Sequence, residues 1–238
     1  MAERIAKFMA RSGVCSRRDA EDIIRQKRVS VDGVVIDSPA FNVEGTENIL
    51  LDGEKLPAIE PTRLWLYYKP QGLVTSHKDE RNRDTVFDNL PPEMPRVISV
   101  GRLDLNSEGL LLLTNNGELS RKLELPENSW SRRYKVRVHG YVDKAKLAEL
   151  AKGMVIDGVN YGPVKAELES QNGTNSWLLI TLTEGKNREI RKLMKYIGLE
   201  VARLIRLSYG PFQLGNLQKG EVREVTQKVL KEQLGSKL

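Results

Sequence analysis

One carboxylate, Asp104, stands in a setting that favours chemistry. It lies in the stretch Gly101-Arg102-Leu103-Asp104-Leu105-Asn106-Ser107-Glu108-Gly109, between two glycines and directly ahead of an apolar run at 110–114. Loops held on a rigid sheet often carry catalytic groups, because the scaffold fixes the direction of their side chains. The same stretch also fits a surface aspartate paired with Arg102, since ion pairs decorate most protein surfaces. The neighbouring segments must decide between these two interpretations.

Three further segments combine residue types that can carry chemistry. They are Tyr68-Lys69-Pro70-Gln71-Gly72, Ser131-Arg132-Arg133-Tyr134-Lys135-Val136 and Glu184-Gly185-Lys186-Asn187-Arg188-Glu189-Ile190-Arg191. Taken alone, each segment is weak evidence for a functional site. A tyrosine in a strand, for example, usually only packs against its neighbours. A nucleoside triphosphate site is rejected, since the third segment lacks the Gly-Lys-Ser/Thr of a phosphate loop.

Composition sets the broad class of protein. At 238 residues, with 39% hydrophobic and 29% charged residues, the chain suits one large or two smaller globular domains. We expect no membrane span and no signal peptide, because Lys7 and Arg11 interrupt its apolar region. Cys15 has no partner cysteine, and His77 and His139 are too few for a zinc cluster. The sequence therefore predicts a cytoplasmic, metal-free protein.

The charge is segregated along the chain. The net charge is +6 with a pI near 9.3, which favours a polyanionic partner without proving one. Residues 1–28 hold eight Lys or Arg against four acids, whereas in residues 29–60 Lys55 alone faces seven acids. This separation is typical of a binding face.

The basic N-terminal segment predicts a small module of helix, helix and hairpin. Apolar spacing predicts a helix that begins near Ile5 and ends at Gly13. Ser16 is the expected N-cap of a second helix, with Asp19 completing a capping box. A hairpin over 29–36 turns at an Asp-Gly pair, which favours a type I′ turn. A strand pair at 48–56 and a linker follow.

The larger C-terminal part predicts an α+β domain with a mixed, mostly antiparallel sheet. Helices are expected over 143–153 and 187–197, and a C-terminal helix over about 222–234 that buries its apolar residues. The expected strands span 64–69, 97–100, 110–114, 134–138 and 177–183, and the residues buried by the last helix are Val225, Val229 and Leu230.

The first module resembles the S4 RNA-binding domain, through the runs Ser-Gly-Val-Cys-Ser-Arg-Arg-Asp-Ala at 12–20 and Arg-Val-Ser-Val-Asp-Gly at 28–33. The resemblance implies that Arg4, Arg17, Arg18 and Arg28 contact RNA phosphates. The alternative is a small helical domain with a solvated basic face, since phosphate contacts carry no sequence code.

The remaining segments, in this order behind such a module, resemble the pseudouridine synthases of the RsuA/RluB group. That family has Gly-Arg-Leu-Asp, two variable residues, Thr, one variable residue and Gly before a leucine run. Here Ser107 stands for the Thr, and Asn116 replaces an Asp often found after the strand. The large-subunit type is indicated by the segments 182–189 and 204–206. The expected domains are 1–57 for the S4-like part, 58–61 for the linker and 62–238 for the catalytic part.

The resemblance implies conversion of a uridine of ribosomal RNA to pseudouridine, without a redox cofactor or a metal. The reaction breaks the bond from C1′ to N1, turns the base and rejoins it through C5. By resemblance Asp104 is the nucleophile, and a carboxylate can form a covalent adduct or stabilise positive charge at C1′. Attack at C1′, attack at C6 and proton abstraction to give a glycal all stay open.

Roles for the other residues follow from the same resemblance. Tyr134 stacks on the flipped base and assists proton removal from C5. Arg191 is the expected cation that pairs with Asp104 and orients it, with Arg188 as its competitor. Arg102 holds the flipped nucleotide out of its stack. The remaining expected RNA contacts are Lys69, Arg132, Arg133, Lys186 and Arg188.

Other interpretations stay open at this point. The chain can instead act on small-subunit ribosomal RNA, or keep the fold as a non-catalytic RNA-binding protein of ribosome assembly. An unrelated Asp-dependent glycosyl-transfer enzyme acting on a small nucleoside needs no basic module. The expected partner is ribosomal RNA or a partly assembled ribosomal subunit. The protein itself is expected to be bacterial and monomeric, and to bind no small-molecule cofactor.

Overall fold

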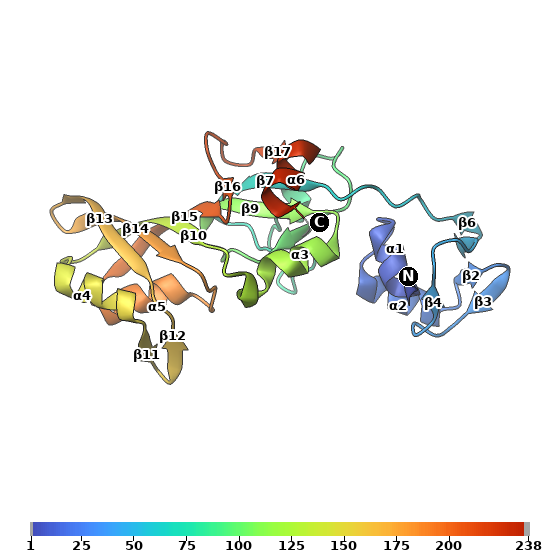
Figure 1. The fold of residues 1–238 in the computed structure, drawn as a ribbon, viewed down its shortest axis with the longest axis horizontal. Helices are drawn as coiled ribbons and strands as arrows, with labels where there is room; N and C mark the ends of the chain where they lie inside the picture. Colours follow the sequence, from blue (N-terminus) through green and yellow to red (C-terminus); the bar gives the residue numbers. More distant parts are fainter. Residues whose placement is uncertain (1, 236–238) are drawn as a thin grey trace. The chain divides into compact units, whose positions relative to one another are not determined.

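A computed structural model describes residues 2–235 of the chain (Figure 1). The chain divides into two compact units. The first takes in the chain up to Arg63, with Glu93–Ile98 and Asn115–Gly117; the second takes in Leu64–Pro92, Ser99–Thr114 and the chain from Glu118 on. Within residues 2–235, none of the helices combines the length and the apolarity needed to cross a membrane.

The first unit contains the two helices and the hairpin expected from the sequence. Helix α1 (Ile5–Arg11) precedes α2 (Arg17–Arg25), and the Ser16 side chain accepts a hydrogen bond from the backbone N–H of Asp19 in the expected capping box. Asp32 and Gly33 both have positive φ, as a type I′ turn requires. The strands of this unit are β1 (Glu3–Arg4), β2 (Val29–Val31), β3 (Val34–Ile36), β4 (Asn42–Val43), β5 (Ile49–Leu51) and β6 (Glu54–Lys55).

The second unit is built on a large mixed sheet with the strand order β13-β14-β10-β15-β9-β7-β17. Neighbours in this order pair antiparallel, except β9 and β15, which run parallel. The expected α+β class is confirmed. The strands of this sheet are β7 (Leu64–Lys69), β8 (Ile98–Val100), β9 (Glu108–Thr114), β10 (Arg132–His139), β13 (Lys165–Asn172), β14 (Asn175–Leu182), β15 (Glu200–Tyr209), β16 (Phe212–Gln213) and β17 (Val222–Glu224).

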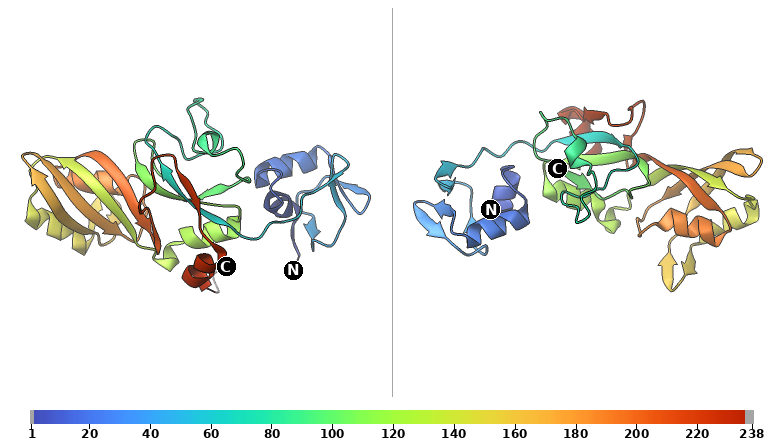
Figure 2. Two further views of the ribbon diagram at one scale, coloured as in Figure 1. Left: turned by 90° about the horizontal axis from the view of Figure 1, so that it is seen from above. Right: turned by 180° about the vertical axis from the view of Figure 1, so that it is seen from behind.

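Two helices of the second unit, α4 (Lys144–Glu149) and α5 (Glu189–Tyr196), cover one face of β13, β14, β10 and β15 (Figures 1 and 2). Successive side chains of a strand point to opposite faces, and in β14 the even-numbered residues, such as Leu178 and Ile180, are the buried ones. The remaining elements are α3 (Gly117–Glu124), α6 (Gln227–Leu234), the β11–β12 hairpin (Met154–Ile156 and Val159–Tyr161) and the 3₁₀ turns η1 (Phe87–Asn89), η2 (Pro126–Asn128) and η3 (Leu150–Lys152).

The leucine run forms the central strand β9, which is buried along its whole length. A strand covered on both faces needs no alternation of polar and apolar residues. At its start, Gly109 has a φ of +104° and lies opposite Arg206 of β15. A Cβ added there would overlap the Arg206 carbonyl oxygen and lie 2.6 Å from its nitrogen. Glycine is therefore required where β9 and β15 meet.

The C-terminal segment departs from its prediction. Residues Val222–Glu224 form strand β17 on the edge beside β7, and the helix begins only at Gln227, with Thr226 as its N-cap. Val225 and Leu230 are buried as expected, but Val229 is 40% exposed. The apolar spacing did not reveal the strand, because three residues are too few to establish a period of two.

Replacing Gly109 by Ala is expected to lower the free energy of unfolding, since the added methyl group overlaps the backbone of β15. The matched control is Gly72→Ala, because Gly72 has a similar φ of +91° and no atom near the added Cβ. We expect Gly109→Ala to cost about 1–3 kcal/mol more than the control. Urea denaturation measures both, and equal losses would contradict the close approach.

Candidate active site

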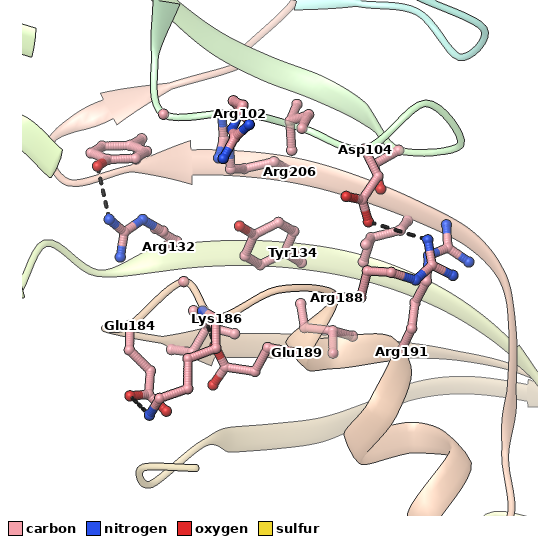
Figure 3. Close-up of a pocket in the computed structure, with 18 of the residues that line it drawn as sticks. Arg102, Asp104, Arg132, Tyr134, Glu184, Lys186, Arg188, Glu189, Arg191 and Arg206 are labelled. Atoms are coloured by element: carbon pink, nitrogen blue, oxygen red, sulfur yellow. Dashed lines mark hydrogen bonds and ion pairs between the residues drawn. The ribbon is translucent and has the colours of Figure 1, made fainter. Parts of the chain in front are cut away.

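A cavity of about 390 Å³ opens in the second unit beside the Asp104 loop (Figure 3). It lies where this loop meets β10, β15, the end of β14 and the start of α5. Its charged and aromatic lining residues are Arg102, Asp104, Glu124, Arg132, Tyr134, Glu184, Lys186, Arg188, Glu189, Arg191, Arg206 and Tyr209. The structure thus brings together three of the four segments that the sequence singles out, from positions up to about ninety residues apart in the chain.

The fourth segment supplies the support of the Asp104 loop. The Lys69 side chain is fully buried, and its ammonium group donates hydrogen bonds to the backbone oxygens of Pro70 (3.0 Å), Asp104 (3.2 Å) and Ser107 (2.9 Å). Burial lowers the pKa of Lys69 to about 8. The expected contact of Lys69 with the RNA backbone is therefore wrong, because this ammonium has no access to solvent.

The Asp104 carboxylate is a partly exposed group that pairs with Arg188, at 3.5 Å between Oδ2 and Nη1. Arg188 precedes α5 in a left-handed conformation, with a φ of +52°. The third segment thus places a cation beside the Asp104 carboxylate, at one end of the cavity (Figure 3).

The structure corrects the expected partner of Asp104, which was Arg191. The Arg191 guanidinium donates instead to the backbone oxygens of Val201 (3.2 Å) and Asn106 (3.0 Å). Burial is the main cause that lowers the pKa of Arg191, followed by the neighbouring charge of Arg188, while the charge of Asp104 acts in the opposite direction. Arg191 therefore links α5 to the Asp104 loop, and its charge also acts on Asp104.

Tyr134 lies in the middle of the cavity, between Asp104 and Arg132 (Figure 3). Its side chain is 8% exposed. It comes from β10, where it stands opposite Arg206 of β15. A ring fixed in a strand is a rigid surface, and a flipped base can stack on it without further ordering.

Arg206 was missed as a site residue at the level of sequence. It is 3% exposed; its Nε donates to the backbone oxygen of Leu110 at 2.6 Å, and its Nη2 is buried without a hydrogen-bond partner in the described structure. A buried guanidinium nitrogen without an acceptor is costly unless a ligand supplies one. The available signal was a lone charge inside the apolar strand Leu204-Ile205-Arg206-Leu207.

The two expected RNA contacts Arg132 and Arg133 point to opposite faces of the sheet. Arg132 lines the cavity, where it donates to the Thr183 oxygen (2.9 Å) and the Tyr209 hydroxyl (2.8 Å). Arg133 is exposed and, being next to Tyr134 on the same strand, faces away from the cavity. Arg102 is exposed at the cavity rim, without a partner among residues 2–235.

Two glutamates, Glu184 and Glu189, lie close together near the start of α5. Glu189 is 4% exposed and accepts a hydrogen bond from the Lys186 backbone N–H at 2.9 Å, while Glu184 accepts one from the Gly162 N–H at 2.6 Å. The Lys186 side chain forms an ion pair with Glu184. Burial, reinforced by the charge of Glu184, raises the pKa of Glu189 to about 7. The sequence did not single out this pair, because nothing local marks a glutamate as buried.

In the first unit, three of the four expected phosphate contacts already have protein partners. Arg4 donates to the Ala40 oxygen, Arg17 lies 3.9 Å from Glu21, and Arg28 pairs with Asp52. Arg18 is exposed and has no partner in the described part of the chain. Across residues 2–235, no group of three or more His, Cys, Asp or Glu side chains is placed to hold a metal ion.

Comparisons with known proteins cover both units. The family model described as RNA pseudouridylate synthase matches residues 63–196, and the S4 domain model matches residues 3–49. An uncharacterized RNA pseudouridine synthase of Rickettsia felis is 49% identical over 96% of this chain and 99% of its own length.

Two further matches span most of the chain. A ribosomal large subunit pseudouridine synthase B of Yersinia pestis is 42% identical over 92% of this chain and 70% of its own length. A crystal structure of a pseudouridylate synthase, 28% identical, superposes with a TM-score of 0.67 over 97% of this chain and 99% of that one. The similarity thus extends over sequence and fold alike.

The buried carboxyl of Glu189 predicts a specific pH dependence of stability. A carboxyl whose pKa is raised in the fold contributes stability that is present below its usual pKa, near 4.5, and is lost as the pH rises through about 7. Glu189→Gln keeps a neutral side chain at every pH. Between pH 5 and 7 the free energy of unfolding should therefore fall more steeply for the wild type, by at most about 1.4 kcal/mol per pH unit.

Denaturation at a series of pH values measures this difference. The exposed Glu149 on α4 provides the matched control, and Glu149→Gln should leave the wild-type slope unchanged. Parallel curves for the wild type and Glu189→Gln would contradict the assignment.

Proposed function

Because the chain belongs to the RNA pseudouridylate synthase family and carries an S4 domain, we propose that it converts a specific uridine of large-subunit ribosomal RNA to pseudouridine. The proposal rests on one observation: the Asp104 carboxylate stands at a cavity lined by Tyr134 and is paired with Arg188. The substrate class is inferred from the Yersinia pestis relative, whose name places its activity on the large ribosomal subunit.

The reaction begins when the target uridine leaves its stack and enters the cavity. Flipping costs a few kcal/mol of lost stacking, which the Tyr134 ring offsets by offering a new surface. Arg102, which is exposed at the rim, is suited to hold the anionic backbone of the flipped nucleotide. The uridine is thereby placed beside Asp104.

Asp104 then acts on the bound nucleotide as a nucleophile. Its partial exposure leaves one oxygen available to the substrate while Arg188 fixes the other. Fixed charges and hydrogen bonds in a dry cavity stabilise a transition state without having to reorganise. The bond from C1′ to N1 breaks, the freed base turns on Tyr134, and a bond from C1′ to C5 replaces it while Asp104 returns to the free carboxylate. C5 then loses its proton with the help of the Tyr134 hydroxyl, and N1 takes up a proton.

RNA outside the cavity is bound by basic residues of both units. Arg18 of the S4 domain has no protein partner among residues 2–235 and is the first side chain that we assign to a phosphate contact. Lys186, Arg4, Arg17 and Arg28 are assigned to further phosphates, which must displace their present protein partners. We further propose that the protein acts in the cytoplasm as a monomer. Its substrate there is ribosomal RNA or a partly assembled ribosomal subunit.

The central test is replacement of the nucleophile. Asp104→Asn keeps the size of the side chain but removes its charge, and should lower turnover by about a thousandfold or more. Asp157→Asn is the matched control, since Asp157 occupies an exposed turn with a φ of +50° that asparagine tolerates. Tritium release from 5-tritiated uridine in ribosomal RNA transcripts measures turnover, and an active Asp104→Asn protein would overturn the assignment.

Substitutions of the two arginines at the start of α5, Arg188 and Arg191, should differ in their effects on kcat and on stability. Arg188→Gln removes the direct partner of Asp104 and is expected to lower kcat by about 10–100-fold, with a change in unfolding free energy below about 0.5 kcal/mol, because its ion pair is exposed. Arg191→Gln removes the hydrogen bonds to the Val201 and Asn106 oxygens and should also cost about 1–2 kcal/mol of stability. The reverse pattern would show that Arg191, and not Arg188, acts directly on Asp104.

A further inference from the structure

The face of the sheet turned away from the catalytic cavity carries a line of basic side chains. Along β10, Tyr134 and Val136 are buried on the face covered by α4 and α5 (Figures 1 and 2). Their neighbours Arg133, Lys135 and Arg137 therefore project from the other face, about 6.6 Å apart along the strand. Arg133 and Arg137 are exposed. The second face is thus accessible and positively charged.

A recess of about 340 Å³ lies on this face at the turn between β13 and β14. Trp177 is directly opposite Arg137 in the strand register. The Lys135 ammonium lies 5.2 Å from the centre of the Trp177 ring. The residues that line the recess are Arg137, Ser170, Gln171, Asn172, Asn175, Ser176 and Trp177. An indole ring flanked by cations and amide side chains therefore forms its wall.

Most polar groups of the recess have no protein partner. Lys135 is neutralised by Glu169 at 2.7 Å. By contrast, in the described structure Arg137 makes no ion pair, and the side-chain amides of Asn172 and Asn175 make no hydrogen bond. The recess therefore offers a positive charge and free donors and acceptors next to an aromatic ring.

This combination matches the chemistry of a nucleotide in single-stranded RNA. Unpaired bases are recognised by stacking on aromatic rings and by hydrogen bonds to their edges. Arginine beside them binds the phosphate, and stacking is worth about 1–3 kcal/mol per base. We propose that the recess binds a nucleotide of an unpaired segment of the RNA substrate, at a distance from the uridine that reacts. The proposal rests on the proposed function for the identity of that RNA.

The recess and the catalytic cavity lie near opposite ends of β14 and on opposite faces of the sheet. Trp177 lines the recess, whereas Leu182 lines the cavity. These residues are five steps apart, which is about 17 Å along the strand. RNA that occupies both sites must pass around the sheet, of which β13 forms the edge beside β14. Only a substrate that extends well beyond the target uridine can do so.

The first test uses the full chain and a ten-residue oligouridylate as the single-stranded probe. Stacking on Trp177 should quench indole fluorescence in the wild type, and Trp177→Phe should remove that part of the quenching while Trp65 and Trp130 remain. Inorganic polyphosphate, a polyanion without bases, should not quench Trp177. Absence of a Trp177-dependent signal, or equal quenching by polyphosphate, would overturn the assignment to a nucleotide.

The second test measures the charge contribution. Arg137→Gln should weaken oligouridylate binding about fivefold and lower the slope of log K against log salt by about 0.7, the value for one phosphate of a single strand. Arg121→Gln is the matched control, since Arg121 on α3 is also exposed and without a partner in residues 2–235. Equal effects of the two substitutions would overturn the proposal.

Turnover separates this proposal from the proposed function. Arg137→Gln should raise KM about fivefold on a long ribosomal RNA transcript, with kcat unchanged, and should leave both constants unchanged on a short hairpin that reaches only the cavity. If the wild type makes no pseudouridine, the proposed function fails while the binding tests still stand. If KM rises equally on both substrates, the separate recess is refuted while the proposed function stands.

Discussion

The buried ammonium group of Lys69 is the contact on which the active site depends. It links the end of β7 to the loop before β9 through three backbone oxygens, two of them within the Asp104 loop. An ammonium without these acceptors would be too costly to bury, so the loop conformation and the buried lysine require each other. The Thr75 hydroxyl adds a hydrogen bond to the Leu103 oxygen at 2.9 Å. Asp104 itself is thus free to meet substrate because its backbone is held.

Charged side chains around the cavity also connect the start of α5 to the Asp104 loop. Arg188 faces Asp104, Arg191 links α5 to the backbone of the same loop, and the buried Glu189 fixes the turn that precedes the helix. The start of α5 and the loop are therefore joined twice, once by an ion pair and once by a hydrogen bond to the Asn106 carbonyl. A cavity organised in this way can exclude water without leaving its own carboxylate unpaired, which is the condition for strong electrostatic stabilisation.

The sheet separates two kinds of surface. The face covered by α4 and α5 builds the cavity, where Arg132 and Tyr134 are held by packing and hydrogen bonds. The opposite face leaves Arg133 and Arg137 exposed, and Arg137 stands opposite Trp177. One strand, β10, therefore supplies side chains to both surfaces, because the alternation of a strand sends neighbouring residues in opposite directions.

The sequence by itself determined the local elements and the family. The Asp32-Gly33 turn, the Ser16 cap, the strand over 64–69 and the helix that follows Arg188 depend on neighbouring residues, so they were predicted correctly. The choice of the Asp104 loop as the candidate nucleophilic loop came from a family resemblance, which the residues of the loop carry by themselves.

Only the tertiary structure decided which charges meet. The hydrogen bonds of Lys69 to the Asp104 loop, the pairing of Asp104 with Arg188 and the hydrogen bond of Arg206 to the Leu110 oxygen all join segments distant in the chain. The burial of Glu189 also depends on how the elements pack. The short edge strand β17 likewise exists because β7 lies beside it. Spacing along a chain predicts which face a side chain takes on its own element, but the partner on that face is set by how the elements pack. The physical reason is that an ion pair depends on distance in space, which local periodicity does not contain.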